Sequence, residues 1–460
     1  MIDRRSLLWL SLAVLGASLL VAVGGADYSD LRGPYCATRG TRGTCCPNRQ
    51  DDCSVPILGT LCYCDDFCNR TNSEDCCPDY WSFCKGIIPP PEPVRECYHN
   101  GRYYVYGETV KINCNECKCQ SMGGRLELLC EQSQCLVDPE IIQGVNADTY
   151  RLGWRASNHT PFWGHRLTEG ISLRLGTLQP QRAVMRMRPV KRVLDPSRLP
   201  RSFDARSKWP GMLSSVRDQG WCGASWAIST ADVASDRFHI MSKGTEPVTL
   251  SAGHLLECNS RGQRGCQGGN LDRAWLFMRK FGVVDEPCYP YTAQSGTPGK
   301  CRLGRRANLL TARCTPPRTL YGPPRTELYR TGPAYRLGSE EDIMHEIMES
   351  GPVQATMKVY HDFFMYRGGI YRHSMLDTTQ RTGYHSVRIV GWGEAQGTKY
   401  WIVANSWGDQ WGENGYFRIR RGTNECEIEN FVVAAWADTQ TPVMDNMMSN
   451  HDNRLSNVVY

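Results

Sequence analysis

The longest apolar run of the chain stands at its start. Arg4 and Arg5 precede an apolar run at residues 7–23, and three small residues, 24–26, follow at once. This layout is typical of a secretory signal peptide, which we expect to occupy residues 1–26. The run approaches the length that spans a bilayer, so an uncleaved signal anchor is the alternative. No later run is long and apolar enough to cross a membrane.

The second half of the chain shows the periods of both helices and strands. Apolar residues recur at steps of three and four after residue 225, which predicts a helix with one apolar stripe facing a core. The recurring positions are Ala227, Ala231, Ala234 and Phe238. The alternating residues 383–387 and the apolar residues 400–404 are typical of strands. The tail, 438–460, is polar and non-periodic, and we expect it to be disordered.

Cysteine usage indicates an oxidising compartment. The 460 residues include 23 cysteines, ten at residues 36–84, six at 97–135 and seven from residue 222 onward. This density implies small modules that depend on disulfides because they lack large cores. Closely spaced cysteines also occur at zinc sites, but in a secreted chain with so many of them we expect disulfides and no metal. Glycosylation sequons at Asn69 and Asn158 fit the same compartment.

Charge is informative only locally. The net charge of +6 is modest and gives no reason to expect a nucleic-acid partner. One stretch is strongly basic and is opposed only by Asp195. Its cations are Arg182, Arg186, Arg188, Lys191, Arg192, Arg198 and Arg201. Three interpretations stay open: a solvated linker, a processing site near Lys191 and Arg192, or a patch for sulfated glycosaminoglycans.

Two small modules are predicted in front of the cysteine-poor part of the chain. The cysteine spacing of residues 62–84 resembles a somatomedin B module, a small disulfide knot that usually binds partner proteins, and we place it at residues 27–87. Four further cysteines at residues 36–53 exceed the usual pattern and leave its pairing open. Residues 88–136 resemble a von Willebrand factor type C module, entered through a proline-rich spacer at 88–93.

The stretch at residues 137–198 contains no cysteine. Its motifs at residues 150–154 and 162–164 resemble the short propeptide of cathepsin B-like enzymes, which lies along the active-site cleft. If the segment stays attached, we expect it to cover the cleft and to hinder substrate entry. A secreted protein that starts near Leu199 would contradict this expectation.

Residues 199–437 resemble papain-like peptidases, and the cathepsin B branch in particular. Residues 219–226 match the nucleophile motif except that Ser225 stands where the family has cysteine. The resemblance implies that Gln219 is an oxyanion donor, that His385 matches the general base, and that Asn405 orients it. It also implies an α+β fold with a helical left lobe, a β-barrel-like right lobe and a cleft between them, preceded by the disulfide-rich modules.

Serine at position 225 changes the mechanism. A papain-like cysteine rests as a thiolate beside an imidazolium, whereas serine must lose its proton during attack. The imidazolium then forms in the transition state and needs a carboxylate beside it, which Asn405 does not supply. We therefore predict no peptidase activity and no cofactor, with Gln219, Ser225, His385 and Asn405 as vestigial positions.

The family resemblance implies further features of this domain. The disulfides would join Cys222 to Cys266, Cys258 to Cys301 and Cys288 to Cys314, leaving Cys426 as a free, buried thiol. Gly268 and Gly269 match the glycine wall that pairs with the backbone of an extended peptide. Trp407, with Trp411, would shield the His385–Asn405 pair from water. Gly268, Gly269 and Trp407 are the candidate binding residues of a surviving groove.

The order of modules, with serine at the position of the nucleophile, is similar to that of the tubulointerstitial nephritis antigen family. The resemblance implies a secreted, non-catalytic glycoprotein of the extracellular matrix or basement membrane, with laminin, collagen, integrins or sulfated glycosaminoglycans as the classes of partner. Two alternatives stay open. One is a working Ser-His hydrolase on this fold, and the other is a carrier or receptor that holds peptides or signalling proteins in the inactive cleft.

Overall fold

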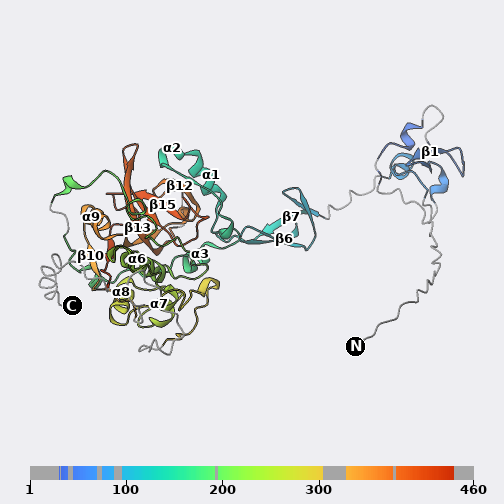
Figure 1. The fold of residues 1–460 in the computed structure, drawn as a ribbon. Coiled ribbons are helices and arrows are strands. Elements are labelled where there is room, and N and C mark those ends of the chain that lie inside the picture. The colour runs from blue at the N-terminus through green and yellow to red at the C-terminus, as the bar shows by residue number, and fades with distance from the viewer. Residues whose placement is uncertain are drawn as a thin grey trace, which may run out of the picture. The chain divides into compact units, whose positions relative to one another are not determined.

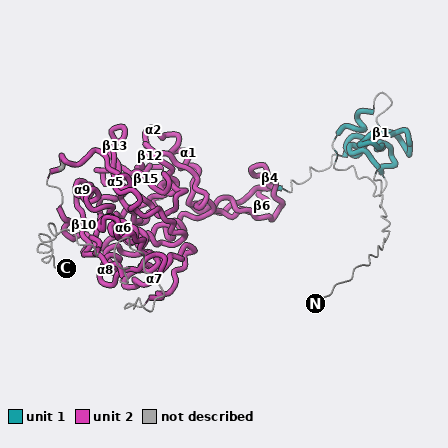
Figure 2. Tube along the Cα trace, in the orientation of Figure 1, with its two compact units in different colours: residues 1–96 teal, residues 97–460 magenta. Residues whose placement is uncertain are grey.

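The computed structural model describes most of the chain as two compact units, within residues 1–96 and 97–460 (Figures 1 and 2). The described residues are 31, 33–39, 45–69, 75–87, 96–191, 195–303, 328–376 and 380–439. The predicted signal peptide, the proline-rich spacer and tail residues 440–460 lie outside them. No helix in these ranges has the length and apolarity that crossing a membrane requires.

Disulfides form most of the interior of the first unit. A short hairpin of β1 (Ser54–Ile57) and β2 (Thr60–Tyr63) is joined to three single helical turns, η1 (Cys36–Thr38), η2 (Asp66–Asn69) and η3 (Tyr80–Cys84). Its five disulfides are Cys36–Cys64, Cys45–Cys84, Cys46–Cys53, Cys62–Cys77 and Cys68–Cys76. Apart from cysteines, the buried hydrophobic cluster holds only Ile57 and Tyr80 among the described residues. The module therefore depends on covalent links rather than on apolar burial.

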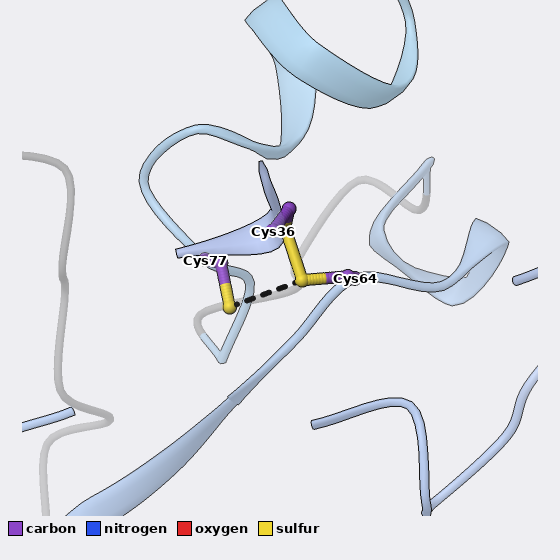
Figure 3. A group of neighbouring side chains, drawn as sticks. All are labelled: Cys36, Cys64 and Cys77. Atoms are coloured by element: carbon purple, nitrogen blue, oxygen red, sulfur yellow. Dashed lines mark hydrogen bonds between the residues drawn. A yellow bond between two sulfur atoms is a disulfide. The ribbon is translucent and has the colours of Figure 1, made fainter. Parts of the chain in front are cut away.

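One cysteine cluster in this unit has the spacing of a metal site. The sulfurs of Cys36, Cys64 and Cys77 lie within 4.8 Å of one another (Figure 3). All three sulfurs are bound in disulfides, Cys36 to Cys64 and Cys77 to Cys62. A disulfide sulfur has no thiolate charge with which to hold zinc, so the cluster is explained without a metal.

The second unit begins with a small all-β module. Strands β3 (Glu96–His99) and β4 (Arg102–Val105) form one hairpin, and β5 (Thr109–Ile112), β6 (Asn115–Met122) and β7 (Arg125–Cys130) form a three-stranded antiparallel sheet. Three disulfides hold it together, Cys97–Cys119, Cys114–Cys135 and Cys117–Cys130. The last of its cysteines, Cys135, leads directly into two fully buried residues, Leu136 and Val137.

A nine-stranded sheet forms the first lobe of the larger domain (Figure 1). In order across the sheet the strands are β10 (Tyr335–Leu337), β16 (Phe431–Ala434), β11 (Val353–Val359), β13 (Gly383–Ala395), β14 (Thr398–Ala404), β15 (Tyr416–Arg420), β12 (Tyr366–Tyr371) and β8 (Trp154–Ala156), while β9 (Phe203–Asp204) pairs with β13. Both strands predicted from the sequence are present, as β13 and β14. Helix α9 (Glu340–Ser350) begins after the N-cap Ser339 and ends at Gly351.

The other lobe is helical. It contains α6 (Ser225–Met241), α7 (Ala252–Cys258) and α8 (Leu271–Lys280), and the short α5 (Ala205–Lys208) precedes them. The predicted apolar stripe on α6 is buried, but it is not the only buried face. All of the 17 residues except His239 and Met241 are buried, because the helix is enclosed between the lobes. Ser229, Thr230 and Ser235 satisfy their hydroxyls on backbone carbonyls four residues earlier in the helix.

The propeptide-like segment is part of the folded domain. It forms α1 (Pro139–Ala147), α2 (Thr149–Leu152), β8, α3 (Leu167–Leu173) and α4 (Arg182–Met185). Strand β8 adds antiparallel to β12 at the edge of the large sheet. Its apolar side chains belong to the same buried cluster as those of the sheet lobe, and they include Ile141, Val145, Leu152, Trp154, Phe162, Leu167 and Leu175.

Candidate functional site

Ser225 lies at the first position of α6, fully buried. The free N–H groups and the dipole of a helix start favour negative charge there, which is the setting that a nucleophile needs. The Ser225 hydroxyl, however, is already engaged. Its Oγ lies 3.0 Å from Oγ1 of Thr177 in the propeptide-like segment, and the Ser386 N–H donates to it at 3.4 Å. Among the described residues, His385 is not a hydrogen-bond partner of Ser225.

His385 and Asn405 form the pair that the sequence predicts. His385 lies in β13, and its Nε2 is 2.7 Å from Oδ1 of Asn405, which directly follows β14. Because that oxygen can only accept, the ring proton lies on Nε2 and Nδ1 is the basic nitrogen. Nδ1 is buried and has no hydrogen-bond partner among the described residues. Trp407 covers the pair, with its ring centre 5.1 Å from that of His385.

The protonated form of His385 is strongly disfavoured. Burial, with a smaller contribution from the charge of Arg174, lowers the pKa of His385 to about 4, although the hydrogen bond that His385 donates to Asn405 acts in the opposite direction. Arg174 is itself almost fully buried, 2.9 Å from Asp218. An imidazolium formed during catalysis would therefore lie in a desolvated place beside a cation and a neutral amide. Among the described residues, no carboxylate pairs with His385, so the anion that a serine mechanism needs is not found there.

The predicted oxyanion donor is occupied as well. Gln219 is buried, and its Nε2 donates to the Leu175 carbonyl at 3.1 Å and to the Cys222 carbonyl at 2.8 Å. Its Oε1 accepts from Ser406 at 2.7 Å, which fixes the direction of the amide. The group that would stabilise an oxyanion thus already holds a carbonyl of the chain's own segment.

Residues 175–178 run through the cleft as an extended peptide would. The Gly269 N–H donates to the Gly176 carbonyl at 3.0 Å, and the Leu178 N–H donates to the Gly269 carbonyl at 2.9 Å. On the opposite wall, the Thr177 N–H donates to the Tyr384 carbonyl at 3.1 Å. The predicted glycine wall therefore pairs with backbone, but the backbone is the protein's own.

Gly176 is required for this close approach. Its φ is +109°, and a Cβ at this position would lie 2.1 Å from the backbone of Gly223, the residue two before Ser225. Gly268 and Gly269 are buried beneath the segment and beside Trp226. A pocket of about 450 Å³ remains next to the segment. It is lined by Ile171, Ser172, Leu173, Gly176, Thr177, Gln267, Gly383 and Tyr384.

The propeptide-like segment, residues 137–198, is held at its start and again just before the cleft. At its start, Nε2 of His361 donates to the carbonyls of Cys135 and Leu136 at 2.9 and 3.1 Å. Closer to the cleft, the Arg174 guanidinium stacks on Phe162 and on Trp221, and Trp407 donates to the Arg174 carbonyl at 2.6 Å. Removing the segment would expose apolar surface from the core of the domain.

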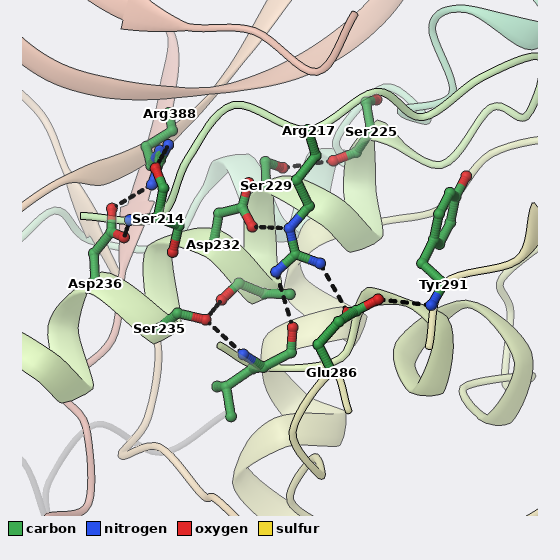
Figure 4. Close-up of polar contacts among 12 residues, drawn as sticks. Ser214, Arg217, Ser225, Ser229, Asp232, Ser235, Asp236, Glu286, Tyr291 and Arg388 are labelled. Atoms are coloured by element: carbon green, nitrogen blue, oxygen red, sulfur yellow. Dashed lines mark hydrogen bonds and ion pairs between the residues drawn. The ribbon is translucent and has the colours of Figure 1, made fainter. Parts of the chain in front are cut away.

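An ionic network that is buried at Asp232, Asp236 and Arg388 fixes the helix that carries Ser225 (Figure 4). Asp236 pairs with Arg388 of β13 at 2.6 Å, and Arg388 also donates to the Ser214 carbonyl at 2.8 Å. One turn earlier, Asp232 pairs with Arg217 at 2.9 Å, and Arg217 reaches Glu286 at 2.9 Å. Burial raises the pKa of Asp236, against the charge of Arg388. Apolar periodicity within α6 gives no sign of these charged residues, because their partners come from distant stretches of the chain.

The predicted cysteines and glycosylation sites can be compared with the structure one by one. Cys222–Cys266 and Cys258–Cys301 form disulfides, and Cys426 is a buried free thiol. Cys288 is disulfide-bonded, while its predicted partner Cys314 lies outside the described residues. Asn69 and Asn158 are both exposed, as acceptors of a glycan must be. Sequence reasoning did not find Thr177 or Arg174, which no motif singles out.

This geometry defines a papain-like domain whose cleft is filled. Residues 199–436 match the family model described as papain family cysteine protease. Among solved structures, a proCathepsin B S9 from Trypanosoma congolense shares 32% sequence identity and a TM-score of 0.54, covering 66% of this chain and 99% of that one. The fold is thus the predicted α+β papain-like fold.

The similarity extends beyond this domain. The chain is 46% identical over 428 residues to the tubulointerstitial nephritis antigen-like protein of Homo sapiens, covering 88% of this chain and 89% of that protein. It is 42% identical over 426 residues to the tubulointerstitial nephritis antigen of Homo sapiens, covering 88% and 87%. The chain belongs to the tubulointerstitial nephritis antigen family.

Proposed function

We propose that this protein is a secreted, non-catalytic glycoprotein of the extracellular matrix or basement membrane that acts by binding partners. The observation that carries the proposal is the hydrogen bond between Ser225 and Thr177 in a cleft filled by residues 175–178. A nucleophile that is bonded to its own chain, away from the base, does not attack a substrate. Disulfide density, the predicted signal peptide and the two exposed sequons support the extracellular part of the proposal.

The working Ser-His hydrolase has little support in this geometry. It would require release of the segment, rearrangement of the Ser225 hydroxyl toward His385, and an imidazolium in a site that lowers its pKa to about 4. In serine proteases, loss of the triad carboxylate alone lowers turnover by about 10⁴. Here the carboxylate is absent and the Gln219 donor is also occupied.

A ligand carrier is the second candidate, and one observation favours it. The pocket of about 450 Å³ beside the segment has the size of a small-ligand site. The edge of the glycine wall is paired with Gly176 and Leu178, so an extended peptide would have to displace the segment first. The pocket suits a compact ligand better than an extended one.

The proposal is tested by adhesion of the full-length secreted protein to surfaces coated with laminin or collagen. Wild-type protein and Ser225→Ala should bind equally, and neither should hydrolyse peptide substrates. Equal adhesion without hydrolysis supports the proposal. Absence of adhesion to every matrix surface, or adhesion that depends on Ser225, contradicts it.

A further inference from the structure

The chain between the cleft and the start of the papain-like domain carries positive charges and no negative ones. Residues 170–194 contain no aspartate or glutamate. Four cations of this stretch, Arg182, Arg186, Arg188 and Lys191, are exposed. None of them forms an ion pair with any residue that the structure describes. We call these four residues the basic strip.

The backbone that carries the basic strip is fixed to the domain. Val184 and Met185 of α4 pack against the hydrophobic core of the helical lobe. Further along, the Val190 N–H donates to the Arg336 carbonyl at 2.8 Å, and Val190 pairs with Leu337 in β10 as an isolated parallel bridge. A Cβ on Gly338 would lie 2.7 Å from Pro189, so this contact is close. The four cations are therefore presented from a docked segment, which reduces the entropy cost of binding.

A fifth cation, Arg336, contacts this segment and has no carboxylate partner among the described residues. The Arg336 guanidinium donates to the carbonyls of Met185 and Asn430 at 2.7 and 2.9 Å. These two carbonyl oxygens are neutral acceptors and do not compensate its charge. Two acids close in sequence to these contacts are paired with other cations, Asp195 with Arg198 and Glu340 with Arg421. No acid that the structure describes forms an ion pair with the strip or with Arg336.

We infer that the basic strip is a binding site for a sulfated polysaccharide of the matrix, an inference that rests on the proposed extracellular function. Such a polymer carries closely spaced sulfates, which suit three exposed guanidinium groups and one ammonium group carried within ten residues. Binding would release counterions from the polymer, so the affinity should fall steeply with salt. The site lies on the segment that a protease would remove by cutting before Leu199, so the secreted protein must retain residues 182–191.

The experiment compares two fourfold variants of the full-length protein with the same change in net charge. The strip variant is Arg182→Gln, Arg186→Gln, Arg188→Gln and Lys191→Gln. The control variant is Lys243→Gln, Arg261→Gln, Arg264→Gln and Lys280→Gln, at four cations that are also exposed. The binding of each protein to immobilised heparin is measured between about 50 and 300 mM salt. Adhesion of each protein is also measured to laminin and collagen surfaces that have been treated with heparin lyase, which removes bound heparan sulfate.

We expect the strip variant to bind heparin at least tenfold more weakly at 150 mM salt, with a shallower dependence of log K on log salt. The control variant should lose less than threefold. Equal losses of heparin binding in both variants would overturn the site, because only net charge would then matter. The same holds if wild-type protein binds duplex DNA and unsulfated hyaluronan as strongly as it binds heparin. Wild-type protein that fails to bind heparin but still adheres to laminin or collagen overturns the inference and leaves the proposed function standing. Loss of adhesion by all forms contradicts the proposed function itself.

Discussion

The hydroxyl oxygens of Thr177 and Ser225 lie 3.0 Å apart at the start of α6, and both residues are buried. One comes from the segment in the cleft and the other from the position of the nucleophile. The same contact therefore engages the reactive hydroxyl and fixes the peptide that blocks it.

The two hydroxyls should be energetically coupled. Ser225→Ala leaves the buried Thr177 hydroxyl without this partner, which costs about 1–3 kcal/mol, whereas replacing both groups costs less than the sum. In a double-mutant cycle of Ser225→Ala and Thr177→Val, we expect a coupling energy of about 1 kcal/mol in the free energy of unfolding. Strictly additive effects would show that the contact is absent in solution.

Gly176 should be intolerant of a side chain. Gly176→Ala places a Cβ 2.1 Å from the Gly223 backbone at a φ of +109°, so residues 175–178 must leave the cleft. We expect faster hydrogen exchange and proteolysis across 167–178. Gly397→Ala is the matched control, since Gly397 also has a positive φ, +73°, but open space around it. Equal protection of the segment in both variants would refute the packing described here.

The ion pair between Asp236 and Arg388 should matter more when one partner is removed than when both are. Arg388→Met leaves Asp236 charged and buried, which costs about 3–5 kcal/mol of unfolding free energy. Combining it with Asp236→Leu should recover a large part of that loss. Chemical denaturation followed by tryptophan fluorescence measures both. A double variant less stable than Arg388→Met would contradict this account.

Acid should destabilise the domain through its buried histidines. Burial lowers the pKa of His254 and of His385 to about 4, whereas both titrate near 6.5 when unfolded. The unfolded state therefore binds protons first, and the stability present above about pH 6.5 is lost as the pH falls toward 4. Each histidine accounts for about 2–3 kcal/mol between pH 7.5 and 4.5.

His254→Gln isolates one of these contributions. The side chain of His254 accepts from the Val284 N–H at 3.3 Å, a contact that a glutamine oxygen can also make. Relative to wild type, the variant should lose about 2–3 kcal/mol less unfolding free energy between pH 7.5 and 4.5. Parallel pH curves for the two proteins would contradict this, because they would show that the pKa of His254 is the same in the folded and unfolded states.

The residues of the site could be predicted from the sequence, but the hydrogen bonds that occupy them could not. Gln219, Ser225, His385 and Asn405 could be found because each stands in a distinctive motif, and the structure brings them to one cleft. Thr177 could not, since a threonine after a glycine in an aperiodic segment carries no pattern. The polar face of α6 was missed for a related reason. Asp232 and Asp236 are buried because Arg217 and Arg388 come from distant stretches, and periodicity within one helix does not show such partners.

The central claim is that Ser225 does not act as a nucleophile. Full-length protein is incubated at neutral pH with a fluorophosphonate probe, which modifies activated serine hydroxyls, beside Ser225→Ala and His385→Ala. The account predicts the same background labelling in all three proteins and no modified peptide that contains residue 225. Near-stoichiometric labelling of Ser225 that disappears in both variants would contradict it.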